Sequence, residues 1–295
     1  MSHIDPPVSK LKLSLQGIIT LLSFASAFPF IQMAVQGGLS ASGLSALRYD
    51  LAALFFLPFC FNRKYLPEKK DLPRIFICTF LGISCYSFLL NYGERSVSAS
   101  ATSLIVCASP VFSAFLGAFF LNEKLTLFAW IGSFIALSGV AIVCFSHGEI
   151  TADNFSGPLI VLTAALCTGG YTVLQRPIVK RYGSLRTLGY FTILSAFFLL
   201  PFLPSGLSEL QHSPLKTWLS LVELVLLPTL IGYGCWAAFC GEIGGAKAGI
   251  ILYAIPPIVM ILSILLEGEI PGKMTLIGGA IVLSGMAVTK MGKKH

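Results

Sequence analysis

The sequence predicts an all-α integral membrane protein, in which ten transmembrane helices form two five-helix repeats of inverted topology. Three observations lead to this prediction: an apolar composition, ten apolar runs of membrane-spanning length, and a similarity between the two halves of the chain. Of the 295 residues, 55% are hydrophobic and only 11% are charged, against roughly 25% charged in an ordinary soluble domain. So few charges could not cover the surface of a soluble protein of this length.

An α-helix needs about 20 apolar residues to cross the hydrocarbon core of a bilayer. Runs of this kind occupy residues 13–35, 42–61, 73–92, 97–121, 127–145, 157–177, 186–204, 217–239, 246–266 and 273–290. The links between them are short and are marked by Gly, Pro or charged residues. The runs are also too long and continuous for a β-barrel, whose strands alternate over about ten residues.

The distribution of Lys and Arg predicts that both termini are cytoplasmic. With the N-terminus inside, the inner segments carry 16 of these residues and the outer segments carry 3. Such a bias sets the orientation of multi-pass proteins. Because the basic residues lie between apolar runs, the net charge of +7 indicates membrane orientation, and we expect a lipid bilayer and no nucleic acid among the partners.

The two halves of the sequence resemble each other after a shift of 146 residues. The shift places Pro110 on Pro256, Glu123 on Glu269, and Leu137-Ser138-Gly139 on Leu283-Ser284-Gly285. We therefore expect a first repeat at 13–145 and a second at 157–290. Because each half has an odd number of spans, the copies would cross the membrane in opposite directions. Inverted repeats of this kind are typical of secondary transporters, whose substrate site lies near the midplane.

Several short motifs occur in a fixed order along the chain. They are Leu44-Ser45-Ala46-Leu47-Arg48-Tyr49, Ala108-Ser109-Pro110-Val111-Phe112, Leu121-Asn122-Glu123-Lys124-Leu125, Trp130-Ile131-Gly132 and Leu137-Ser138-Gly139-Val140, with partial copies at Pro256, Gly268-Glu269 and Ser284-Gly285. In this order they resemble the EamA family of the drug/metabolite transporter (DMT) superfamily. The resemblance implies a ten-helix exporter of the bacterial inner membrane, typically for amino acids or other small metabolites. One departure is Ser26-Ala27, where many members carry Trp-Gly.

Three prolines fall within predicted spans and are candidates for helix kinks or gating: Pro29, Pro110 and Pro256. A proline inside a helix removes one N–H donor and frees the carbonyl four residues earlier. In the hydrocarbon core that carbonyl needs a partner. Neighbouring helices could supply it, or a substrate could, and both interpretations remain open.

Polar and amphipathic side chains recur at helical spacing in several spans, and their convergence would form a substrate site. The candidates are Gln32, Tyr86, Asn91, Ser103, Tyr171, Gln175, Tyr233, Trp236 and Tyr253. Uncharged polar atoms and amphipathic rings suit an organic solute that must bind and leave again. The alternative is that the small polar groups pack helices together and that Tyr and Trp mark the membrane interface.

Charged residues inside spans cost about 2.5–3.5 kcal/mol each and are candidates for function. Glu223 could couple transport to protons or bind an ammonium group. However, it lies roughly 120° around a regular helix from the stripe of Thr229, Tyr233 and Trp236, and could serve helix packing alone. We expect Arg48 to extend outward to the interface or to bind a carbonyl group.

The sequence carries no signature of an enzyme, and we predict no catalytic residues, no cofactor and no metal site. The predicted function is secondary-active export of amino acids or similar small metabolites. One alternative is a multidrug or organic-cation exporter, and another is a membrane scaffold or enzyme that does not transport. A small-residue face at Gly132 and Ala136 would permit either a contact within the chain or a homodimer.

Overall fold

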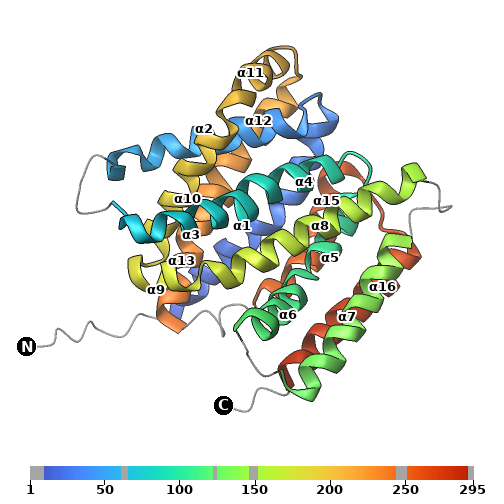
Figure 1. Ribbon diagram of the computed structural model, residues 1–295. Coiled ribbons are helices and arrows are strands. Elements are labelled where there is room, and N and C mark those ends of the chain that lie inside the picture. Colours follow the sequence, from blue (N-terminus) through green and yellow to red (C-terminus); the bar gives the residue numbers. More distant parts are fainter. Residues whose placement is uncertain (1–9, 61–65, 122–124, 146–151, 244–250, 292–295) are drawn as a thin grey trace, which may run out of the picture.

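The computed structural model describes residues 10–60, 66–121, 125–145, 152–243 and 251–291. In these ranges every regular element is a helix (Figure 1), which confirms the predicted all-α class. The elements of the first half are α1 (Lys10–Gln36), α2 (Ala41–Cys60), η2 (Lys69–Asp71), α3 (Leu72–Thr79), η3 (Phe80–Cys85), α4 (Tyr86–Gly93), α5 (Ala99–Val106), α6 (Ser109–Leu121) and α7 (Leu127–Phe145).

The second half contains a similar series of helices. Its elements are α8 (Ala152–Leu174), α9 (Arg176–Tyr182), α10 (Ser184–Leu199), η4 (Leu200–Phe202), α11 (Leu203–Gln211), α12 (Leu215–Leu224), η5 (Val225–Gly232), α13 (Tyr233–Ile243), η6 (Ile251–Ala254), α15 (Ile255–Glu267) and α16 (Lys273–Met291). Both η3 and η5 are π-helical, whereas η2, η4 and η6 are 3-10 helices.

Seven helical stretches are long and apolar enough to cross a membrane. They are Lys10–Gln36, Lys69–Gly93, Ala99–Phe120, Leu127–Phe145, Ser156–Leu174, Ser184–Gln211 and Leu215–Cys240, and two apolar helices are shorter, Ile251–Glu267 and Lys273–Thr289. The predicted count of ten spans is therefore not confirmed. Helix α2 carries the charged residues Arg48 and Asp50, and residues 246–250 of the ninth predicted span lie outside the described ranges.

The surface of the bundle is apolar and many small polar side chains lie inside it. Phe119 and Leu265 are 80% and 73% exposed, whereas Thr20, Ser45 and Thr192 are completely buried. A soluble protein would expose polar groups instead. Lipid accepts apolar side chains, while polar groups must find partners within the protein. The distribution is that of a multi-pass membrane protein.

Helix ends recur at corresponding positions in the two halves. The shift of 146 residues moves the bounds of α7 from 127–145 to 273–291, which are the bounds of α16. It moves α6 from 109–121 to 255–267, the bounds of α15. The π-helix η3 moves from 80–85 to 226–231, inside η5. The sequence repeat is thus accompanied by a repeat of local structure, including its irregular segments.

Helices α7 and α16 pack side by side at one edge of the bundle (Figure 1). Glycines allow this close approach, because a Cβ atom on Gly132 would lie 2.5 Å from the carbonyl oxygen of Gly285 and one on Gly139 would lie 2.6 Å from the backbone nitrogen of Val282. The small-residue face that includes Gly132 therefore makes a contact within the chain.

The three prolines differ in their helical context. Pro29 lies inside α1, which continues without interruption. Pro110 lies in the first turn of α6, after the two-residue turn that follows α5, and Pro256 lies in the first turn of α15, which directly follows η6. A proline in the first turn of an α-helix removes an N–H that has no intrahelical partner, and both prolines lie within the apolar helical stretches Ala99–Phe120 and Ile251–Glu267. Their role in gating stays a prediction.

Candidate functional site

Arg48 of α2 lies inside the bundle. Its side chain is only 7% exposed, and its Nε donates a hydrogen bond of 2.8 Å to Thr229 Oγ1 of η5. The Thr229 hydroxyl in turn donates to the carbonyl oxygen of Leu224 at 2.7 Å. The expected outward extension of Arg48 is therefore wrong: α2 packs against α10 and η5, so that this face of the helix meets protein.

Four tyrosines lie in the same part of the bundle as Arg48: Tyr49, Tyr86, Tyr171 and Tyr233, from α2, α4, α8 and α13. Electrostatic interactions connect Arg48 to Tyr86 and Tyr233, and connect each of Tyr86, Tyr171 and Tyr233 to Tyr49. The Arg48 guanidinium also lies 5.4 Å from the centre of the Tyr49 ring. We call these five residues the central cluster. Three of them were predicted site residues, whereas Tyr49 was not.

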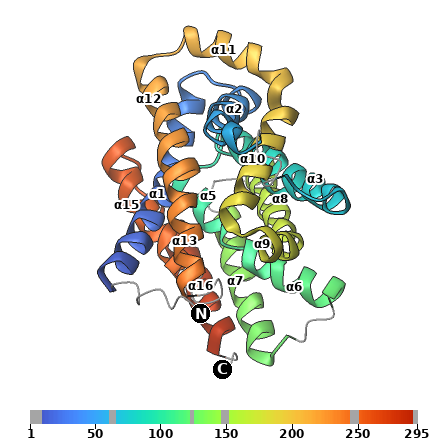
Figure 2. The same ribbon diagram turned by 90° about the vertical axis from the view of Figure 1, so that its left-hand side faces the viewer.

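Aromatic rings extend the central cluster along α1 and α13. The Phe24 ring lies 5.0 Å from the Tyr233 ring and 6.3 Å from the Trp236 ring, measured between centroids. Figure 2 shows α1 next to α12 and α13, as their packing requires. On the opposite side, the Tyr171 ring occupies the space that a side chain at Gly82 of η3 would need.

Glu223 of α12 lies next to this cluster. Its Oε1 accepts a hydrogen bond of 2.5 Å from Ser26 Oγ of α1, and its Oε2 is buried without a hydrogen-bond partner among the described residues. An electrostatic interaction connects Glu223 with Arg48. The predicted separation of 120° between Glu223 and the stripe assumed a regular α-helix. This assumption fails, because the π-helix η5 lies between Glu223 and Tyr233 and has more residues per turn.

Glu94 was not predicted, although it is 1% exposed and neither carboxylate oxygen has a hydrogen-bond partner among the described residues. It follows the end of α4, outside the membrane-spanning stretch. Burial and the nearby Glu267 carboxylate raise the pKa of Glu94 well above its ordinary value, against the opposing effect of Arg48. In the sequence Glu94 stands beside Arg95 in a short link, which is the pattern of an exposed ion pair.

Two predicted residues, Gln32 and Asn91, hold helices together. Gln32 Oε1 accepts a hydrogen bond of 2.7 Å from the backbone nitrogen of Ala99 at the start of α5. Asn91 Nδ2 donates to Ser45 Oγ of α2 at 3.0 Å. Both side chains are buried. These contacts connect helices through buried polar groups, although Asn91 Oδ1 is buried without a hydrogen-bond partner among the described residues.

Three more predicted residues lie apart from the central cluster. Ser103 Oγ donates to the carbonyl oxygen of Ser100, one turn earlier in α5, at 2.7 Å. Gln175 stands at the junction of α8 and α9. Tyr253 is hydrogen-bonded with Thr289 of α16. Of the nine predicted side chains, Tyr86, Tyr171, Tyr233 and Trp236 are thus the ones that the structure brings together.

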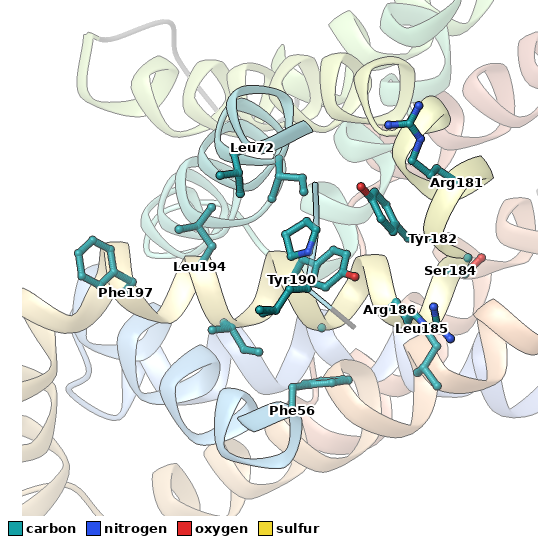
Figure 3. Close-up of a pocket in the computed structure, with 16 residues that line it drawn as sticks. Phe56, Leu72, Arg181, Tyr182, Ser184, Leu185, Arg186, Tyr190, Leu194 and Phe197 are labelled. Carbon is teal, nitrogen blue, oxygen red and sulfur yellow. The ribbon is translucent and has the colours of Figure 1, made fainter. Parts of the chain in front are cut away.

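A separate cavity of about 820 Å³ lies between α2, α3, α9 and α10 (Figure 3). Apolar side chains such as Phe56, Leu194 and Phe197 form most of its lining, and Arg181 and Arg186 lie at one end. None of the predicted site residues lines it. Its large apolar share suits an acyl chain or another lipophilic group better than a small polar solute.

Contacts near this cavity connect the two halves of the chain. Asp71 Oδ2 accepts hydrogen bonds of 2.6 Å from Arg181 Nη1 and from the Tyr182 hydroxyl. The Tyr182 hydroxyl oxygen also accepts from the backbone nitrogen of Glu68 at 3.0 Å. We call Asp71, Arg181 and Tyr182 the α3–α9 latch. At the other end of α2, Glu209 accepts from the Ser40 backbone nitrogen at 2.8 Å.

Comparison with known proteins places these features in a family. The chain is 36% identical to an uncharacterized transporter, YdfC, of Bacillus subtilis, over 90% of this chain and 87% of the relative. It is 34% identical to a "Probable terminal-alkyne amino-acid exporter" of Streptantibioticus cattleyicolor, over 91% and 90%. It is 23% identical to a "Probable amino-acid metabolite efflux pump" of Salmonella typhimurium, over 82% and 85%.

A solved structure and a family model also match the chain. A crystal structure with 18% identity covers 96% of this chain and 98% of its own, with a TM-score of 0.63, which shows a shared fold. The model of the EamA-like transporter family matches residues 12–145 and again residues 155–291. The chain, with its apolar surface and its buried polar centre, therefore belongs to the EamA-like transporter family.

Proposed function

We propose that the protein is a secondary-active exporter of amino acids or similar small metabolites in the bacterial inner membrane. The observation that carries this proposal is the central cluster, in which tyrosines from both halves lie in the same part of the bundle as a buried arginine. Two relatives with an amino-acid exporter or efflux pump in their names support the choice of substrate class. Both termini would be cytoplasmic, in agreement with the distribution of Lys and Arg.

The mechanism would be alternating access between two repeats of five spans, 13–145 and 157–290. The recurrence of helix ends and of the π-helices after a shift of 146 residues supports this division. Inverted repeats place a solute site near the membrane midplane, where rocking of one half against the other exposes it to either side. The composition of the central cluster supports such a site, because Tyr86 belongs to the first half and Tyr171 and Tyr233 to the second.

The chemistry of the cluster suits a small metabolite. Tyrosine rings provide apolar area together with a hydroxyl that can donate or accept a hydrogen bond. Phe24 and Trp236 add ring surface for an apolar side chain of the solute. Glu223, with its unpartnered Oε2, would carry the proton that couples export to a gradient.

Counterflow in proteoliposomes tests the proposal. Vesicles that hold the purified protein are loaded with one unlabelled L-amino acid at a time, and the entry of the labelled form is followed. We expect saturable counterflow with at least one amino acid and a loss of roughly tenfold or more in Tyr233→Ala, the usual scale for removing a central aromatic anchor. Tyr92→Ala is the matched control, because Tyr92 is 44% exposed on the outer surface. Absence of counterflow with every amino acid would overturn the substrate class.

One observation favours organic cations as a second candidate class. The carboxylate of Glu223 and the rings of Phe24, Tyr233 and Trp236 lie on the neighbouring helices α1, α12 and α13, and aromatic faces together with a carboxylate bind ammonium groups. Counterflow of tetraethylammonium that Glu223→Gln abolishes, in protein that moves no amino acid, would establish this class instead.

A further inference from the structure

Arg48 is a buried cation that makes no ion pair with any residue that the structure describes. The ion pairs among the described residues join Lys70, Arg181, Glu68 and Asp71, and none includes Arg48. Its single hydrogen bond from Nε goes to a neutral hydroxyl. The terminal Nη groups, which carry four of the five donors of a guanidinium, make no hydrogen bond with the described residues. Burying an unpaired charge costs folding free energy, and buried charges in native proteins are ordinarily paired.

Two carboxylates interact electrostatically with Arg48 without forming an ion pair within 4.0 Å. They are Glu223, whose Oε2 is unpartnered, and Glu94, whose two oxygens are unpartnered. The interior of the bundle therefore holds a cation and carboxyl groups whose bonding capacity is unused. A ligand with one negative and one positive end would satisfy both kinds of group at once.

We propose that Arg48 binds the carboxylate of the transported solute and that Glu223 binds its ammonium group, so that the substrate is a zwitterion of the amino-acid type. This inference rests on the proposed function and names the atoms that would recognise the solute. The Thr229 hydroxyl holds Nε and leaves the Nη side of the guanidinium available for a carboxylate. Ser26 holds Oε1 of Glu223 in the same way and leaves Oε2 for the ammonium.

The planar guanidinium gives this site a specific preference. Two parallel N–H donors match the two oxygens of a carboxylate, which a lysine ammonium cannot do. A solute without the carboxylate would leave Arg48 unpaired, and one without the ammonium would leave the Glu223 oxygen unpaired. The site would therefore bind such analogues weakly, because each of them leaves a buried polar group of the protein unpaired. Unpaired buried groups discriminate strongly between a substrate and an analogue that lacks the matching group.

The experiment measures thermal stabilisation of the purified full-length protein by defined ligands. Each common L-amino acid is added at roughly 10 mM, since ligands stabilise only above their dissociation constants. For the amino acid with the largest shift, the methyl ester and the decarboxylated amine are then compared. We expect the amino acid to stabilise the wild-type protein and both analogues, which lack the carboxylate charge, to bind at least about tenfold more weakly.

Substitutions of Arg48 and Glu223 test whether these two side chains bind the solute. Arg48→Lys keeps the positive charge but not the planar pair of donors, and we expect it to weaken binding of the amino acid about tenfold or more. Arg95→Lys is the matched control, because Arg95 is exposed. Glu223→Gln should weaken binding of the amino acid while leaving binding of its N-acetyl derivative, which lacks the ammonium, unchanged relative to wild type.

The outcomes separate this inference from the proposed function. If the amino acid and its methyl ester stabilise the wild-type protein equally, the Arg48 assignment is wrong although the transporter still binds amino acids. If no amino acid binds or is moved in counterflow, the proposed substrate class fails together with the assignment. The comparison of ligands uses wild-type protein only, so it holds even if an Arg48 variant does not fold.

Discussion

At the scale of single residues, amphipathic side chains inside the spans were easier to find than their surroundings. Tyr86, Tyr171 and Tyr233 were candidates because amphipathic rings inside a span need a polar partner, and their role in binding stays a prediction. The burial of Arg48 did not follow, since the sequence does not say which face of α2 meets another helix. Asn91 and Gln32 carry amide groups that could bind a ligand. In the structure, however, they form hydrogen bonds with a hydroxyl group and a backbone nitrogen of adjacent helices.

Glu94→Gln should stabilise the protein increasingly as the pH rises. The folded state raises the pKa of Glu94 above the ordinary value of 4.5, chiefly through burial. Below that value both states are protonated and no penalty arises. As the pH rises through the raised pKa, the unfolded state releases its proton first, and stability is lost. Glutamine has no proton to lose.

The measurement is the midpoint of thermal unfolding in detergent across about pH 4 to 8, the range in which the unfolded carboxyl ionises. Glu242→Gln, which changes an exposed glutamate, is the control and should show no such trend. A Glu94→Gln variant that is less stable than the wild type at the upper end would mean that Glu94 is an ionised, paired carboxylate.

At the scale of elements, regular helices were predicted well and irregular ones were not. The predicted span 127–145 has the bounds of α7, and the span 273–290 ends one residue before α16 does. The π-helices η3 and η5 have no signature in hydropathy, because a π-helix changes the hydrogen-bond pattern and not the composition. The angle predicted for Glu223 assumed a regular helix, whereas η5 lies between Glu223 and Tyr233. The turn before α6 and the 3-10 helix before α15 were predicted only as proline kinks.

Gly139→Ala should loosen the packing of α7 on α16. The added Cβ would lie 2.6 Å from the backbone nitrogen of Val282 and 2.7 Å from the carbonyl oxygen of Gly278, and backbone atoms cannot move aside without separating the helices. Overpacking of this kind costs about 1–3 kcal/mol. We expect a lower thermal midpoint with unchanged ligand preference, since the central cluster is elsewhere.

Gly234→Ala is the matched control for this substitution. Gly234 also lies in a helix, α13, but a Cβ atom there would meet nothing within 4 Å. Alanine has the higher helix propensity, so the control should be neutral or slightly stabilising. Equal destabilisation by both variants would show that the close approach of α7 and α16 contributes nothing specific.

At the scale of the whole molecule, contacts between the halves lie at both ends of the bundle. The α3–α9 latch joins Asp71 to Arg181, and Glu209 joins the start of α2 from the other half. Composition was sufficient to predict the membrane class. It was not sufficient for these contacts, because composition does not specify which side chains of distant helices meet.

Replacing Arg181 by Asp should open the end of the bundle at the α3–α9 latch, and exchanging both charges of the pair should close it again. Arg181→Asp places a carboxylate beside Asp71 and should separate α9 from α3. A cysteine at Leu194, which lines the adjacent cavity (Figure 3), should then react faster with a maleimide in a cysteine-free background. Adding Asp71→Arg restores an ion pair of opposite polarity and should slow the reaction again. A rate that stays high in the double variant would mean that the latch does not control this opening.

The claim that the central cluster is the solute site is tested most directly by the fluorescence of Trp236. Of the three tryptophans, Trp130 and Trp218 are 43% and 42% exposed on the outer surface, and their replacement by phenylalanine leaves Trp236 as the single reporter. We predict that the amino acid that drives counterflow shifts the emission of Trp236 saturably, with a midpoint equal to its stabilising concentration. Unchanged Trp236 emission, in protein that still moves that amino acid, would place the solute site elsewhere.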